Sequence, residues 1–224
     1  MPRVDFELPT RIPPELAELI ELAPTPGLGA VPKCQVTFDR VQNLLRKHSR
    51  LKGELTEAAV WLLAGELDRS HEVSQGIETP EAAFWHGIMH RREGDFFNAK
   101  YWFRKVGKHP VFVQLAEQIS QYRSQSTARD RSGSDPSLDH SPPGNPKPAN
   151  PSPGNPPPDN TPPDNPTYDD FWRQIRADLS DPTKMAEALV DECERALASQ
   201  PSQIIPLQRI CWLEWQFLFH YGWD

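Results

Sequence analysis

The chain has 224 residues, of which 37% are hydrophobic and 25% are charged, and its formal net charge is -7. That length and apolar fraction suffice for one ordinary domain with a core, or for one domain and a long additional segment. The acidic balance argues against general nucleic-acid binding, which normally requires a basic surface that displaces counterions from phosphates.

The N-terminal part of the chain shows helical periodicity. Residues 14–22 form a short amphipathic stretch, and residues 37–51 repeat apolar side chains at helical spacing. Residues 54–75 are predicted to form one further helix, whose apolar face ends at His71.

Helix boundary signals are clearest in the middle of the chain. Thr79-Pro80-Glu81 supplies an N-cap, a proline at the first helical position and an early acidic group. Gly94-Asp95 closes this helix and caps the next, and Gly107 ends that second helix. His109-Pro110 opens a third helix, which we expect to run toward Tyr122.

This middle segment resembles a known repeat motif. Residues 80–110 are similar to one tetratricopeptide hairpin of about 34 residues, with Ala99 on the central alanine of that pattern. In this register Gly87 takes the glycine position of the first helix, and His86 and His90 replace its leucine and tyrosine. The longer stretch from residue 70 to residue 110, with LEWQFLF near the C-terminus, is also similar to a group of small bacterial proteins without an assigned activity.

The composition changes completely between residues 124 and 167, where PGNP and PPDN each occur twice. Such a stretch has little apolar surface to offset the entropy lost on ordering, so a disordered or polyproline-type linker is predicted. It is either a plain tether or a polyproline ligand for a partner domain.

Three more helices are predicted after the linker, over residues 168–179, 181–199 and 206–221. The last of these is apolar nearly all round, and such a helix must be covered. The C-terminal residues 168–224 are too few to cover it, so we expect them to pack on residues 1–123. The fold class is therefore all-α: a single helical domain of about six to seven helices, interrupted by a disordered Pro/Asn-rich insertion. The alternative is two small modules joined by the linker.

Two histidines are expected to lie on a packing face of the hairpin. His86 and His90 fall where a simple hairpin would be apolar, and each buried imidazole without a partner costs about 1 to 3 kcal/mol. The preceding helix carries Asp68 and His71 on one stripe.

Asp68, His71, His86 and His90 would then form a carboxylate and imidazole set of the kind that binds metals in helical bundles. Zinc, manganese or iron held there could activate water, with Glu93 as a candidate catalytic base. A site without metal that binds another ligand, and purely structural histidines, are the other two interpretations.

Basic residues are concentrated in the same hairpin. A phosphate or carboxylate ligand could be bound by four of them: Arg91, Arg92, Lys100 and Arg104. Alternatively these residues pair with acidic groups inside the molecule, such as those of the helix that contains Asp191.

Several function classes lack sequence support. There is no glycine-rich nucleotide loop and no nucleophile elbow, and Cys34, Cys193 and Cys211 lack a metal-binding or disulfide spacing. A signal peptide and a transmembrane segment are not expected either, because the apolar stretches contain charges or prolines. These features favour a reducing, cytoplasmic setting.

The sequence thus predicts a cytoplasmic α-helical binding or interaction module with a polar histidine cluster in its core. Its partner would be a protein or a small anionic ligand. The alternative is a metal-dependent hydrolase, or another small-molecule enzyme, that uses Asp68, His71, His86 and His90. No cofactor is indicated beyond a possible divalent metal.

Overall fold

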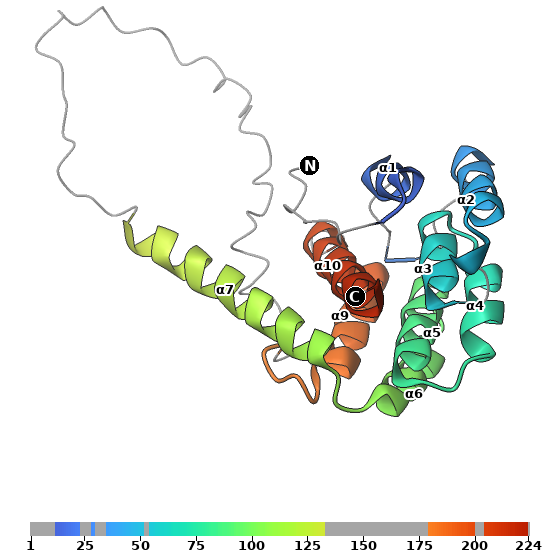
Figure 1. Ribbon diagram of the computed structural model, residues 1–224. Helices are drawn as coiled ribbons and strands as arrows, with labels where there is room; N and C mark the ends of the chain where they lie inside the picture. Colours follow the sequence, from blue (N-terminus) through green and yellow to red (C-terminus); the bar gives the residue numbers. More distant parts are fainter. Residues whose placement is uncertain are drawn as a thin grey trace, which may run out of the picture.

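The computed structural model describes residues 12–22, 28–29, 35–51, 54–132, 179–199 and 204–223. All regular elements within these residues are helical, which confirms the all-α class (Figure 1). The described residues form one short 3-10 helix, η1 (Ser49–Leu51), and nine α-helices, where six to seven were expected. The α-helices are α1 (Pro14–Leu22), α2 (Gln35–Lys47), α3 (Leu55–Leu63), α4 (Leu67–Gln75), α5 (Pro80–Glu93), α6 (Phe96–Val106), α7 (Pro110–Ser132), α9 (Met185–Ser199) and α10 (Ile204–Trp223).

The single helix predicted over residues 54–75 is wrong. The chain forms α3 and α4 instead, and it turns at Gly65, whose φ of 74° lies in the left-handed region that favours glycine. The two helices pack against each other, and α4 also packs against α5. The turn therefore places α4 as a separate short helix beside α5.

The predicted boundaries of the central hairpin are confirmed. The Thr79 hydroxyl oxygen accepts a hydrogen bond from the Ala82 amide at 3.2 Å and caps α5. Gly94 ends α5 with a φ of 88°. Asp95 then caps α6 by accepting a hydrogen bond from the Asn98 amide at 3.0 Å. Because the intervening turn is so short, α5 and α6 pack side by side along their length.

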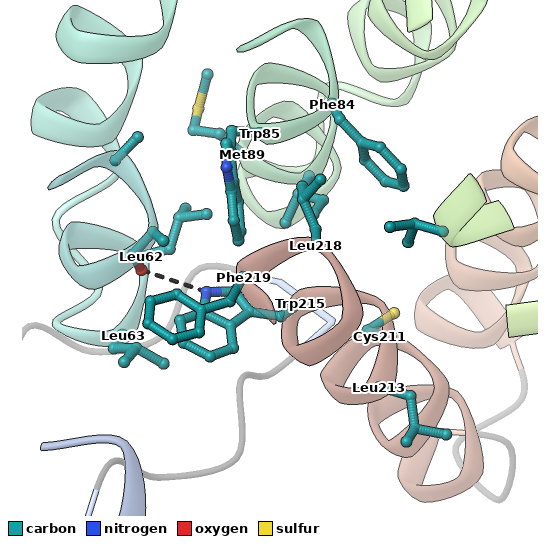
Figure 2. Close-up of a cluster of buried hydrophobic side chains, with 14 of the residues drawn as sticks. Leu62, Leu63, Phe84, Trp85, Met89, Cys211, Leu213, Trp215, Leu218 and Phe219 are labelled. Carbon is teal, nitrogen blue, oxygen red and sulfur yellow. Dashed lines mark hydrogen bonds between the residues drawn. The ribbon is translucent and has the colours of Figure 1, made fainter. Parts of the chain in front are cut away.

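The C-terminal helices contact the N-terminal part of the chain. Helix α10 packs against α3, α7 and α9, and α9 packs against α6. The Trp215 indole donates a hydrogen bond to the Ala59 carbonyl at 3.2 Å, and its ring meets Trp85 edge to face (Figure 2). Buried side chains from α1 to α10 belong to one hydrophobic core. The apolar circumference of α10 is thereby largely covered.

Helix α7 is longer than predicted. It was expected to end near Tyr122, with the linker beginning at residue 124, but it continues to Ser132. No proline or glycine interrupts the sequence from Val111 to Ser132, and Gly133 follows.

The rest of the predicted linker lies outside the described residues. The helix predicted over residues 168–179 also lies outside them, except for residue 179, which is in a turn. None of the described helices combines the length and the apolarity that a bilayer-crossing segment needs.

Candidate metal centre

Three histidine rings meet where α4 packs against α5. His71 comes from α4, and His86 and His90 come from successive turns of α5. The ring centroid of His71 lies 4.4 Å from that of His86 and 5.5 Å from that of His90, and the two α5 rings are 4.9 Å apart. One ring nitrogen from each histidine can be chosen so that all three atoms lie within 4.8 Å of one another. The structure thus brings together three of the four residues predicted as metal ligands.

His86 is the most deeply buried member of this histidine cluster. His86 is only 1% exposed to solvent. Neither of its ring nitrogens has a hydrogen-bond partner among the described residues. The Trp102 ring of α6 stacks on it, with centroids 3.9 Å apart and planes 14° from parallel. Burial, followed by the nearby charges of His71, His90 and Lys105, lowers the pKa of His86 to about 3. The ring is therefore neutral near pH 7, the form in which an imidazole coordinates a metal.

His90 is held in place by a neighbouring carboxylate. Its Nδ1 atom lies 2.9 Å from Glu93 Oε1, one helical turn further along α5. A carboxylate that accepts a hydrogen bond from one ring nitrogen orients the imidazole and leaves the other nitrogen, Nε2, for coordination. Glu93, predicted as a candidate base, is thus placed to orient His90. Its side chain is 38% exposed, so it lies on the solvent side of the cluster.

Asp68 does not join the cluster. It is exposed, and it belongs to neither of the ligand groups found among the described residues. Asp68 and His71 lie three positions apart on α4, and of this pair it is the His71 ring that meets the two α5 histidines.

The four basic residues predicted to bind an anion are engaged inside the molecule. Arg91 forms a buried ion pair with Glu214 of α10, and Arg92 donates a hydrogen bond to the Leu62 carbonyl. On the opposite side of the hairpin the partners belong to α9: Lys100 pairs with Asp191, and Arg104 donates to Glu187 at 2.6 Å and 3.1 Å. These contacts correspond to the alternative in which the basic residues pair with groups of the same chain.

Two features of the site were missed from the sequence. The first is Trp102 of α6, which covers one face of the His86 ring. The second is Arg91 of α5, which points away from the histidines and pairs with Glu214 of α10. The first had a detectable signal: in a hairpin that closes at Gly94-Asp95, residues equally distant from the turn face each other, which pairs position 86 with 102 or 103. The second had none, because an ion pair between residues 91 and 214 leaves no local pattern.

No protein-family model, curated protein or solved structure matches the chain. Fold and site together define an all-α protein with a cluster of three histidines, two of them buried, between two adjacent helices.

Proposed function

We propose that this chain is a helical binding module whose ligand is a transition-metal ion, held by His71, His86 and His90. The observation that carries the proposal is the buried His86 ring, whose two nitrogens lack hydrogen-bond partners among the described residues while two other imidazoles lie beside it. Each unsatisfied buried polar atom costs about 1 to 3 kcal/mol. A metal–nitrogen bond would remove part of that cost.

The type of ligand atom selects the class of metal. Imidazole nitrogens bind zinc, copper, nickel and cobalt well, whereas magnesium and calcium prefer oxygen ligands. The hydrogen bond between His90 and Glu93 supports this assignment, because metal-ligating histidines usually donate their other ring N–H to a carboxylate or carbonyl. We therefore assign a borderline divalent ion such as Zn²⁺ or Co²⁺ to the cluster.

The hairpin supports the binding-module part of the proposal. A Cβ atom added to Gly87 would lie 3.1 Å from the Phe103 ring, so this glycine is what allows α5 and α6 to approach closely. Gly87 and Phe103 also occupy the positions of the tetratricopeptide pattern where a glycine and a packing residue are usual. We propose that the hairpin is tetratricopeptide-like and serves as a rigid frame for His86 and His90.

The test is a Zn²⁺ titration of full-length protein stripped with a chelator, monitored by competition with a chromophoric chelator. We expect one ion per chain, and a weakening of more than about 100-fold in His86→Gln or His71→Ala, since even residues that only orient a ligand contribute about 10- to 100-fold. His48→Ala is the matched control, because His48 follows α2, lies beside Glu15 and belongs to neither group of candidate ligands among the described residues. Absence of stoichiometric binding, or equal binding by wild type and His86→Gln, would refute the proposal and leave a metal-free interaction module.

A further inference from the structure

The histidine cluster supplies three ligands, and the carboxylates nearest to it are committed elsewhere. Asp68 is exposed and outside the cluster, Glu93 is bonded to His90, and Asp95 accepts hydrogen bonds from the Asn98 amide and side chain. Zinc and cobalt sites in proteins take four or more ligands, and sites with three protein ligands leave a position for water or substrate. On the basis of the proposed function, we infer that the bound ion keeps an exchangeable position that is filled by a small exogenous anion.

The charge balance of the site favours an anion over a neutral ligand. Three neutral imidazoles leave the double positive charge of the ion uncompensated, and burial makes that charge costly. The Lys105 ammonium adds to the positive potential, since its Nζ lies 4.3 Å from the centroid of the Trp102 ring that stacks on His86. Two carboxylates oppose it at the edge of the cluster: Glu93, through its hydrogen bond to His90, and Asp95, which has an oxygen within 4.8 Å of ligand atoms of His90 and Glu93. A hydroxide, carboxylate or small inorganic anion at the open position would lower this electrostatic cost.

Access to that position is asymmetric. The side of His86 is closed by Trp102, whereas His71 is half-buried and Glu93 is partly exposed. Solvent therefore reaches the cluster from the side of His71 and Glu93. The anion-binding role that the sequence suggested for Arg91, Arg92, Lys100 and Arg104 is here given to the metal ion, because each of these four side chains already has a partner within the molecule.

The experiment is an azide titration of the Co²⁺-loaded full-length protein, followed by visible absorption. Tetrahedral Co²⁺ with three imidazoles absorbs strongly, and replacement of its fourth ligand shifts the bands. We expect a saturable change with azide, reversed by removing the azide. A Co²⁺ spectrum typical of bound, four-coordinate metal that azide does not change would overturn this inference and leave the proposed metal binding intact. If no Co²⁺ binds at all, the proposed function itself fails.

Glu93→Gln separates a positioning role from direct coordination. If Glu93 orients His90, the variant weakens Co²⁺ binding by about 10- to 100-fold while the spectrum of the saturated protein and its azide response stay as in wild type. If Glu93 is itself the fourth ligand, wild type resists azide and only the variant responds, which would contradict the open position.

Discussion

The buried imidazole of His86 makes the stability of the metal-free protein depend on pH. The folded-state pKa of about 3 lies below the ordinary value of 6.5, so below pH 6.5 the unfolded chain binds a proton that the folded chain does not. Stability is therefore lost as the pH falls from 6.5 toward 3, by at most about 1.4 kcal/mol per pH unit. We expect His86→Gln to remove this part of the pH dependence.

The measurement is urea unfolding of both proteins at several pH values between about 7 and 5, with a chelator present. The difference in unfolding free energy between wild type and His86→Gln should shrink, or change sign in favour of the variant, as the pH falls. Parallel pH profiles for the two proteins would show that the ring is protonated in the folded state or is not buried.

At the scale of single residues, the sequence predicted that the three histidines meet, but it also placed Asp68 among them. His86 and His90 follow from the spacing within one helix whose caps are unambiguous, and His71 follows from the neighbouring helix. Asp68 was predicted from its spacing of three residues from His71, but it is exposed and lies outside the cluster. The pairing of Arg91 with Glu214 depends on tertiary packing between distant segments, which no local spacing encodes.

The packing of α5 on α6 depends on Gly87. Its substitution by alanine would place Cβ 3.1 Å from three atoms of the Phe103 ring. That ring is buried and meets Phe84 edge to face, so it has little room to move. Overpacking of this kind costs about 1 to 3 kcal/mol. The gain in helix propensity on replacing glycine recovers up to about 1 kcal/mol, so we expect Gly87→Ala to be destabilising by about 1 kcal/mol.

Gly222→Ala is the matched control, because Gly222 also lies in a helix but faces open space. It should leave the free energy of unfolding unchanged or raise it slightly. Chemical denaturation of the two variants and wild type compares them directly. Equal stabilities for Gly87→Ala and Gly222→Ala would mean that the hairpin is looser than described.

Elements were predictable where capping residues mark both ends. Thr79, Pro80, Gly94 and Asp95 act through local hydrogen bonds and backbone geometry, and α5 and α6 begin and end where these residues indicate. The break between α3 and α4 was not found, because Gly65 sits inside an apolar helical pattern without a proline or an N-capping serine or threonine beside it. The end of α7 was misplaced because the change in composition at residue 124 precedes the first helix-breaking residue, Gly133.

The whole molecule relies on contacts between residues far apart in the chain. Trp215 bonds to the Ala59 carbonyl, Glu214 pairs with Arg91, and acidic residues of α9 pair with the hairpin on its other side. The general need to cover α10 could be inferred from its apolar circumference. The sequence did not indicate which helices cover α10, because the prediction named only the N-terminal part as a whole.

Truncation after Pro166 removes α9 and α10 together. The shortened chain would expose the buried faces of α3 and α7 and would leave the Arg91 guanidinium in the core without Glu214. Loss of one partner of a buried ion pair alone costs about 3 to 5 kcal/mol, which is comparable with the whole stability of many domains. We expect the fragment to lose its cooperative unfolding transition and to aggregate, as followed by thermal circular dichroism and light scattering.

Co-expression of residues 168–224 as a separate chain should restore a soluble complex, because the same surfaces can then meet without a covalent connection. A soluble truncated fragment that unfolds cooperatively by itself would instead establish two independent modules, and the histidine cluster would then belong wholly to the N-terminal one.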